Sequence, residues 1–92
     1  MQVVLYGLAG ASPVEHMLLE LAAGSTLGEL LRALEHHRGG GVLAEVVLPD
    51  GAIRPEVAVL VNGANVGLGD GTATLLRDGD QVTMMPVISG GA

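Results

Sequence analysis

One segment of this chain carries a clear helical period. Four leucines lie at positions i, i+3, i+4 and i+7, namely Leu27, Leu30, Leu31 and Leu34, and this spacing aligns them on one helical face. Thr26 and Glu29 have the spacing of a capping box, in which each side chain binds a free backbone N–H of the first turn. Basic side chains at 36–38 suit the negative end of a helix dipole, and the glycines at 39–41 favour termination. We predict a helix from about Leu27 to His37 whose leucine face must be covered.

Extended segments precede that helix. Val3 to Tyr6 is a short apolar run, and Leu8 to Pro13 is rich in turn-forming residues, so we expect a strand and then a loop. An antiparallel return over Val14 to Leu21 would complete a hairpin. Its alternation would place Glu15, Met17, Leu19 and Leu21 on one face and His16, Leu18 and Glu20 on the other. The same segment is also compatible with a helix, and we prefer the hairpin.

The segments after the helix are mostly extended as well. Val42 to Leu48 and Ala52 to Arg54 flank Pro49-Asp50-Gly51, where Asp-Gly supplies the positive φ values of a hairpin turn. Val57 to Val61 is a β-branched run, for which we predict a central strand buried on both faces. We further expect an edge strand at Asn65-Val66, an irregular crossing from Gly67 to Leu76, a turn at Asp78-Gly79-Asp80 and a last strand from Gln81 to Met85.

This order of elements predicts the fold class. A helix between an opening hairpin and later strands is a crossover, and such a chain suits a mixed sheet with one covered face. The 92 residues, 49% of them hydrophobic, suffice for one modest core. We predict a single α+β domain over residues 1–92, with about four to five strands packed on one main helix. A flexible tail is expected over about 87–92.

Charge and cysteine content limit the partners. Ten acids against four arginines and no lysine give a net charge of −6, so we expect no nucleic-acid binding and favour a basic protein partner. The absence of cysteine removes thiolate nucleophiles and thiolate metal ligands. The apolar runs are shorter than the roughly 20 residues that cross a bilayer, and the first residues lack the basic region of a signal peptide. We expect a cytoplasmic protein with no membrane partner.

No cluster of residues predicts catalysis or metal binding. His36 and His37 are adjacent, so on a helix their side chains point about 100° apart, whereas helical metal pairs are spaced i and i+4. Asp78-Gly79-Asp80 is interpreted as a turn. No nucleophile or acid lies near His16 at a spacing typical of a catalytic site, so we expect His16 to be packed in the core or exposed on the surface. The sequence therefore favours binding or carrying over catalysis by the chain alone.

The second half of the chain has a recognisable order of motifs. The apolar run from Val57 ends in Asn62-Gly63, and it is followed by Leu76, Asp78-Gly79-Asp80, Val82, Pro86 and Gly90-Gly91. The opening of the predicted helix, from Thr26 to Leu31, fits the same pattern. This order resembles the ubiquitin-like sulfur-carrier family, which includes the molybdopterin synthase small subunit and the thiamine-biosynthesis sulfur carrier. The resemblance implies a β-grasp fold, with which the independently predicted helix and strands agree.

The resemblance also implies a chemistry for the C-terminus. Family members offer a terminal glycine carboxylate to a ubiquitin-activating-type adenylyltransferase, which uses ATP and Mg²⁺, and a sulfur donor then forms a thiocarboxylate. Gly91 would be that site, and Gly90 and Gly91 would thread a narrow partner channel because glycine lacks a Cβ. The carrier itself would hold no cofactor and no catalytic residue. Ala92 departs from the family's Gly-Gly end, and we expect a metalloprotease to remove it; the alternatives are a cloning remnant or a merely disordered terminus.

Partner docking is expected on the sheet face away from the helix and on the acidic surface. The candidates are His16, Leu18, Met84, Met85 and Pro86, with Asp78 and Asp80 at the rim. Because Met84 and Met85 are neighbours in a strand, one should pack in the core while the other faces a partner.

The resemblance leaves more than one partner and function open. The implied partners are the adenylyltransferase and the molybdopterin synthase large subunit or another sulfur-accepting enzyme. We prefer the molybdopterin or tungstopterin branch because of Asn62-Gly63 and the Pro86-containing end, with thiamine or another thio-metabolite as the second choice. The alternative of another class is a non-catalytic β-grasp interaction module or protein modifier.

Overall fold

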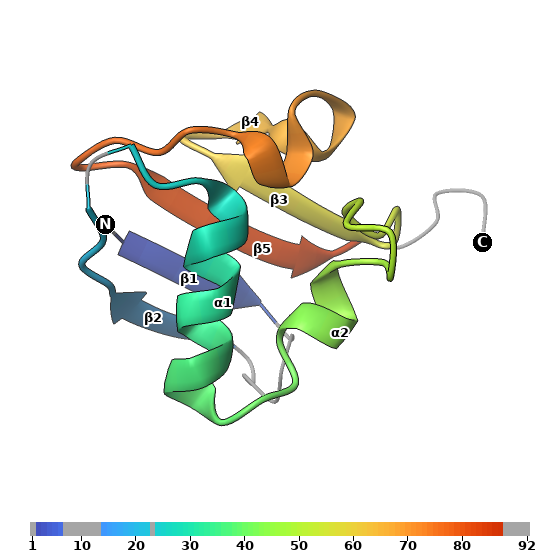
Figure 1. Ribbon diagram of the computed structural model, residues 1–92, viewed down its shortest axis with the longest axis horizontal. Coiled ribbons are helices and arrows are strands. Elements are labelled where there is room, and N and C mark those ends of the chain that lie inside the picture. Colours follow the sequence, from blue (N-terminus) through green and yellow to red (C-terminus); the bar gives the residue numbers. More distant parts are fainter. Residues whose placement is uncertain (1, 7–13, 23, 88–92) are drawn as a thin grey trace.

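The computed structural model describes residues 2–6, 14–22 and 24–87 (Figure 1). In chain order the elements are β1 (Gln2–Tyr6), β2 (Val14–Leu18), α1 (Leu27–Arg38), α2 (Leu43–Val46), β3 (Val57–Val61), β4 (Ala64–Asn65), the short 3-10 helices η1 (Val66–Leu68) and η2 (Gly71–Ala73), and β5 (Gln81–Pro86). The predicted loop over Leu8 to Pro13 lies outside the described residues.

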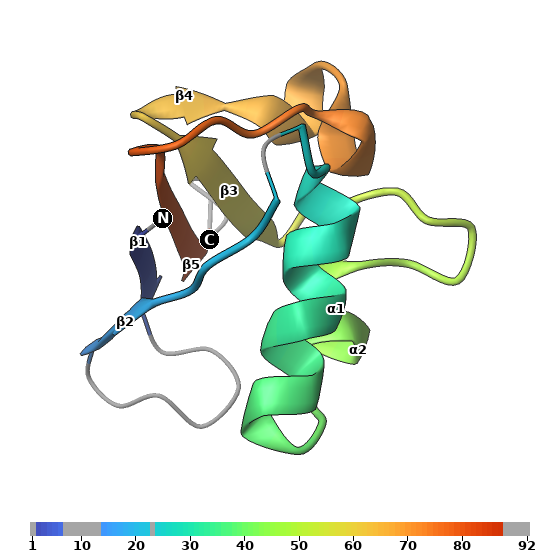
Figure 2. The same ribbon diagram turned by 60° about the vertical axis from the view of Figure 1, so that its left-hand side comes forward.

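The five strands form one mixed sheet in the order β2-β1-β5-β3-β4. β1 pairs antiparallel with β2 and parallel with β5, and β3 pairs antiparallel with both β5 and β4. A parallel pair of the first and last strands needs a crossover connection, and α1 belongs to that connection. Figure 2 shows α1 standing on one side of the sheet. This is the mixed sheet with one covering helix that the order of elements predicted, and it is the β-grasp arrangement that the resemblance implied.

The core lies between α1 and the sheet. Leu27, Leu30, Leu31 and Leu34 are completely buried, as their spacing predicted. They pack with Val59 and Val82, which are also fully buried, and with the partly buried Val61. The buried cluster consists of valines, leucines and one methionine. Without aromatic rings in this cluster, cohesion depends on close packing of many small aliphatic contacts.

Both ends of α1 follow the predicted signals. The Glu29 N–H donates to Thr26 Oγ1 over 3.2 Å, and the Thr26 N–H donates to a Glu29 carboxylate oxygen over 2.9 Å. At the other end Gly39 has a φ of 80°, a left-handed conformation that favours glycine. The helix extends to Arg38, one residue beyond the predicted end.

The prediction of an extended segment from Val42 to Leu48 is wrong over most of its length, because Leu43–Val46 forms the short helix α2. The physical reason lies in Glu35 of α1. One of its carboxylate oxygens accepts the N–H of Val42 over 2.7 Å and the N–H of Leu43 over 3.0 Å. This contact satisfies two of the free N–H groups where a helical turn begins. Only the end of the segment is extended, where Val47 pairs with Ile53 across the predicted turn.

β3 also differs from its prediction. The strand lies second from the sheet edge, and β5 occupies the centre. Val57 and Val59 are buried, but Ala58 and Leu60 alternate with them and are only half-buried, because α1 covers one face of the sheet. The prediction of a central strand buried on both faces is therefore wrong on both counts.

The remaining elements agree with the sequence. The opening hairpin is present, with Val4 opposite His16, so the helical alternative for the second segment is wrong. The predicted edge strand is β4, which begins one residue earlier than expected. The crossing from Gly67 contains most of η1 and all of η2 before it reaches β5.

Candidate docking face and tail root

Strand β5 contributes alternate residues to the two faces of the sheet. Val82 and Met84 are fully buried in the core, whereas Thr83 and Met85 point the other way and are half-buried. Met84 therefore lies too deep to contact a partner, and its place among the docking candidates is wrong. Met85 is the methionine that faces outward, as expected for one member of the pair. Pro86 is exposed, but its alternation puts it on the α1 side, at the end of the strand.

We call the sheet surface opposite α1 the open face. It includes Val4, Val14, His16, Leu18, Ala58, Leu60, Thr83 and Met85, and the same register places the exposed polar residues Gln2, Gln81 and Asn65 on this side. The register brings four of these residues into one row across four strands, in the order His16, Val4, Thr83 and Leu60. At the β2 edge Leu18 is 79% exposed and Val14 is 37% exposed. The predicted docking residues His16 and Leu18 thus share this face with Met85.

The open face is shallow rather than cleft-like. Val4 at its centre is only 1% exposed, although α1 lies on the other side of the sheet; its neighbours across the strands are His16 and Thr83. A hollow of about 280 Å³ at the β2 edge is lined by Gln2, His16, Met17 and Leu18. The arrangement offers an apolar surface with one titratable histidine, which is suited to contact with a protein rather than to enclosing a small substrate.

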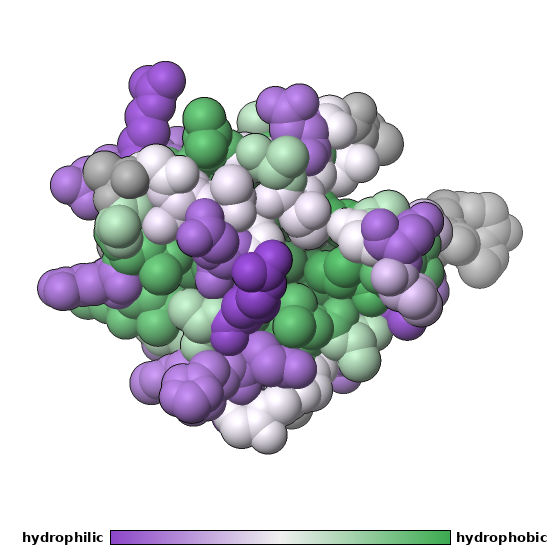
Figure 3. All heavy atoms as spheres, in the orientation of Figure 1, coloured by the Kyte–Doolittle hydropathy of each residue, from purple (hydrophilic) through white to green (hydrophobic). Residues whose placement is uncertain are grey.

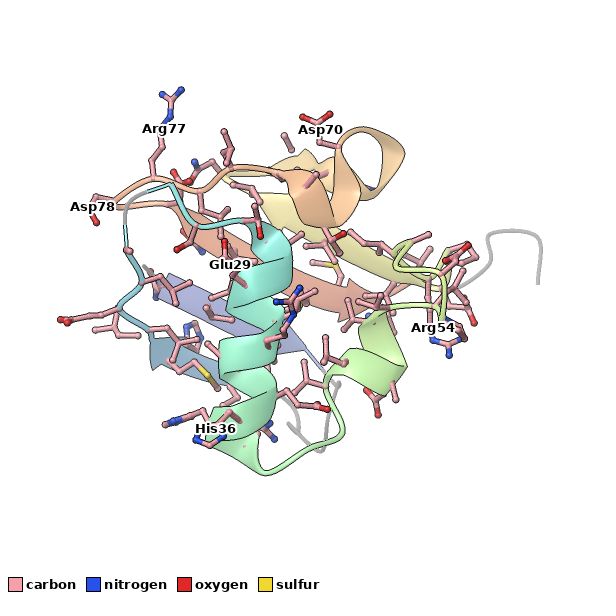
Figure 4. All side chains as sticks on the ribbon, viewed as in Figure 1. Glu29, His36, Arg54, Asp70, Arg77 and Asp78 are labelled. Carbon is pink, nitrogen blue, oxygen red and sulfur yellow. The ribbon has the colours of Figure 1, made fainter. Side chains whose placement is uncertain are left out.

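Charged side chains lie around the open face and not on it. The residues that form it include no Asp, Glu or Arg. Figure 4 shows Asp78 and Arg77 at the loop before β5, at one end of the sheet. Glu15 belongs to the other side of β2 and forms an ion pair with Arg38 of α1. Any contribution of acidic residues to docking would therefore come from the rim of the open face, where the sequence placed Asp78 and Asp80.

Asp80 connects two loops at that rim. Its two carboxylate oxygens accept the Arg77 N–H over 2.8 Å and the Asn62 side-chain N–H over 2.9 Å. The side-chain Oδ1 of Asn62 in turn accepts the Gln81 N–H over 2.9 Å. The backbone hydrogen bond from Arg77, with that from Asn62, holds the pKa of Asp80 below its ordinary value, because both bonds favour the charged form. Asp80 therefore fixes the turn after β3 against the start of β5.

The chain leaves the sheet from its middle strand. Pro86 pairs with Val57, and Val87 then donates its N–H to the Glu56 carbonyl oxygen over 2.7 Å. A hollow of about 290 Å³ beside this point is lined by Ile53, Arg54, Pro55, Val57, Asn65, Gly67 and Val87. The root of the tail is thus held by backbone pairing as far as Val87. The predicted functional residues Gly90, Gly91 and Ala92 follow and lie outside the described residues.

The α1 side of the molecule presents a different surface. Figure 3, drawn from that side, shows hydrophilic side chains projecting among apolar ones. Next to α2 a groove of about 430 Å³ is lined by Leu43, Ala44, Val47, Leu48, Pro49, Gly51 and Arg54. In the described part of the chain no group of three or more His, Asp and Glu side chains could hold a metal ion. None of the helices described is long and apolar enough to cross a membrane.

Comparison with known sequences and structures identifies the family. The profile of the ThiS family matches residues 8–91. The chain belongs to the ThiS family. It is 45% identical over 67 residues to small archaeal modifier protein 3 of Haloferax volcanii, which covers 73% of this chain and 71% of that protein. It is 35% identical over 72 residues to the sulfur carrier protein CysO of Mycobacterium tuberculosis, which covers 76% of each chain.

The structural comparison agrees with the sequence comparison. The crystal structure of CysO from Mycobacterium tuberculosis has a TM-score of 0.67 and 26% identity, and the alignment covers 94% of this chain and 99% of that chain. The chain is therefore a β-grasp member of a family of sulfur carriers and ubiquitin-like modifiers, as the order of motifs indicated. The ThiS match includes Gly90 and Gly91 and ends one residue before Ala92.

Most of the open-face residues were absent from the predicted docking set, among them Val4, Val14, Ala58, Leu60 and Thr83. All of these except Val14 alternate with a fully buried core residue in their strand, so period-two alternation was the available signal. Alternation alone does not show which strands lie side by side. The row that joins Leu60 to His16 depends on the sheet order, and that order is set by pairing between distant segments.

Proposed function

We propose that this chain is a sulfur carrier whose Gly91 carboxyl group, once Ala92 is removed, is adenylated and converted to a thiocarboxylate. The observation that carries this proposal is the ThiS match through Gly91, on a tail that continues the middle strand of a β-grasp sheet. The relative named sulfur carrier protein CysO supports it. Catalysis belongs to the partner enzymes, and the chain contributes the acyl group and the surface that presents it.

The proposed chemistry has two steps. A Gly91 carboxylate oxygen attacks the α-phosphorus of ATP on the adenylyltransferase and pyrophosphate leaves, with Mg²⁺ balancing the phosphate charge. The resulting acyl adenylate has AMP as a good leaving group, which the free carboxylate lacked. A hydrosulfide-level donor attacks the carbonyl carbon, the C–O bond to AMP breaks, and the product is a thiocarboxylate at Gly91.

The geometry of β5 links docking to this chemistry. Met85 on the open face lies two residues before Val87, where the tail begins. From Val87 the chain reaches at most about 14 Å to the Gly91 carbonyl when fully extended. A partner that binds the open face around Met85 therefore holds the reacting carbonyl within one tail length of that contact, whereas Leu18 lies opposite Gln2 and Gln81 at the other end of the sheet. We propose this face as the adenylyltransferase docking surface.

Removal of Ala92 follows from the same chemistry. In the full-length chain the Gly91 carbonyl carbon is bound in an amide to Ala92, so it has no carboxylate to activate. We propose that a protease, of the metalloprotease class that the family resemblance implies, exposes it. The glycine pair then enters the partner's channel without a Cβ at the reacting residue.

The test uses two forms of the chain, one ending at Ala92 and one ending at Gly91. Each is incubated with the cognate adenylyltransferase, ATP, Mg²⁺ and a sulfide donor, and intact masses are read for replacement of one oxygen by sulfur. We expect conversion of the Gly91-ending form alone. Equal conversion of both forms would remove the need for trimming, and no conversion by an enzyme active on a reference carrier would refute the carrier proposal.

We propose molybdopterin or tungstopterin synthesis as the use of this sulfur, on the basis of the Asn62-Gly63 turn and the Pro86-containing end. The thiocarboxylate form should then transfer sulfur to a pterin precursor on the molybdopterin synthase large subunit. Absence of transfer to the pterin, with transfer to a thiamine precursor or another acceptor, would redirect the assignment within the carrier class.

Protein modification is a second candidate, and a specific observation favours it. The relative with 45% identity is named small archaeal modifier protein 3. In that function the activated Gly91 carbonyl is passed to an amine of a target protein. Mass spectrometry of cell extracts would separate the two uses, since a modifier leaves Gly91 in amide linkage to target lysines and a carrier leaves it as a free thiocarboxylate.

A further inference from the structure

Apart from its histidines, the chain has four basic side chains, and all of them are arginines. They are Arg32, Arg38, Arg54 and Arg77, and the 92 residues contain neither lysine nor cysteine. A guanidinium stays protonated at physiological pH and does not attack carbonyl groups, whereas lysine amines and cysteine thiols do. The chain therefore has an activatable acyl end but lacks the lysine amines and cysteine thiols that would form an amide or a thioester with it; its histidines could form only an acyl imidazole, which water hydrolyses.

Four hydroxyl groups in the described part of the chain are engaged in hydrogen bonds. Ser25 is almost fully buried and donates its hydroxyl to the Ala22 carbonyl over 2.7 Å. The Thr74 hydroxyl donates to the Gly71 carbonyl over 2.7 Å, and the Thr72 hydroxyl donates to the Gly51 carbonyl over 3.3 Å. The Thr26 hydroxyl donates to the Glu29 carboxylate over 3.3 Å and accepts the Glu29 N–H in the helix cap. A serine or threonine hydroxyl is a weak nucleophile unless a base activates it, so these groups are poorer acceptors than a lysine amine or a cysteine thiol.

We propose that this chain is an acyl donor only, passing its activated tail to a sulfur nucleophile or to an amine on another protein without receiving a second copy of itself on any side chain. This rests on the proposed activation of Gly91. Conjugates built with it would contain no chains linked through its own side chains. Activated copies held at high concentration around the adenylyltransferase would not cross-link one another through side chains.

The excluded reaction is specific. In it, an amine nitrogen attacks the Gly91 carbonyl carbon of an acyl adenylate, the C–O bond to AMP breaks, AMP leaves with the electron pair, and the nitrogen loses a proton to solvent. A lysine on another protein can supply that nitrogen. None of the four arginines can.

The test introduces one amine at a time by replacing an arginine with lysine, which keeps the net charge. Arg77 is exposed, and Figure 4 shows its side chain projecting from the molecule, so R77K presents a free amine. Arg38 has a side chain only 17% exposed and is paired with Glu15, so R38K presents a shielded one. R77Q removes the cation without adding an amine. All are made as forms ending at Gly91 and incubated with adenylyltransferase, ATP and Mg²⁺ but no sulfur donor.

We expect amide-linked dimers from R77K, with position 77 as the branch site in peptide mass spectra, fewer from R38K, and no side-chain-linked dimers from the original sequence or R77Q. Hydroxylamine trapping of a parallel sample as the hydroxamate reports adenylation independently. If no hydroxamate forms, the proposed function fails for that enzyme, and the donor-only inference fails with it. If the hydroxamate forms, side-chain-linked dimers of the original sequence, or the absence of dimers from R77K, would overturn the donor-only inference alone.

Discussion

The two faces of the sheet are made from alternate residues of the same strands, and they differ in what covers them. Under α1, Val59, Val82 and Met84 have no exposed surface, whereas on the open face Leu18 is 79% exposed and Thr83 and Met85 are half-buried. Both faces are largely apolar. The face on which an apolar strand residue lies therefore decides whether it contributes to the stability of the fold or to recognition of a partner. Two neighbours in one strand lie on opposite faces, so substituting each of them tests the two roles separately.

The largest expected effect is on the covered face. Leu31→Ala removes a fully buried side chain and should lower the free energy of unfolding by about 2–5 kcal/mol, since a cavity remains in an all-aliphatic cluster. Urea denaturation followed by circular dichroism measures the loss. Leu18→Ala on the open face is the control, with an expected change of about 0.5 kcal/mol or less. Similar losses from the two variants would contradict the assignment of the faces.

A second test compares two neighbours in β5. Met84→Ala should cost about 2–5 kcal/mol in unfolding free energy, and Met85→Ala about 1 kcal/mol or less, because only the first side chain is fully enclosed. Binding to the adenylyltransferase, measured by calorimetry, should show the reverse order once both variants are folded. If Met85→Ala binds as tightly as the original sequence, the open face around β5 is not the docking surface.

The sequence predicted what depends on local spacing. The leucine face of α1, the Thr26–Glu29 capping box and the hairpin turn residues all act within a few positions of one another. The sequence did not predict α2, because the Glu35 contact with Val42 and Leu43 forms only after the chain reverses at the glycines. Contacts between distant segments set the remaining features.

The choice between Met84 and Met85 illustrates the second limit. Alternation showed that one methionine faces inward, but the sheet order decides which face α1 covers. The same holds for β3, whose valine run is typical of a central strand, although β5 occupies the centre. The bond between Asn62 and Asp80 joins residues 18 positions apart, so the motifs around them predicted two turns and not their connection.

A third effect concerns the edge of the open face. Leu18→Ser should leave stability nearly unchanged but weaken binding to the adenylyltransferase by about 1 kcal/mol, roughly fivefold in Kd, because a contact residue loses apolar area. The matched variant is Asp78→Asn at the rim, whose smaller effect should disappear as salt rises, since exposed charges are screened. A salt-dependent loss for Leu18→Ser would mean that charge rather than apolar contact dominates at this edge.

The smallest expected effect belongs to neither face. Asp80 holds the loop before β5 through the Arg77 N–H and the Asn62 side chain, and these bonds lower its pKa from the ordinary 3.8. A carboxyl group with a lowered pKa in the folded chain stabilises the fold above its unfolded pKa. That stabilisation is lost as pH falls through the folded pKa.

Unfolding free energies measured between about pH 6 and pH 2 should therefore decline in acid, and Asp80→Asn should decline less, because an amide does not titrate. Asn62→Ala is the complementary variant: it removes one of the two bonds that lower the pKa and should reduce the acid-dependent loss only in part, with the bond from Arg77 retained. Since Asp80 is largely solvated, the difference between the original chain and Asp80→Asn should be smaller than any change on the covered face. If the original chain, Asp80→Asn and Asn62→Ala lose stability equally in acid, the hydrogen bonds of Asp80 contribute nothing measurable to the free energy of unfolding. The stability differences among the variants would then depend only on which face of the sheet carries the substitution.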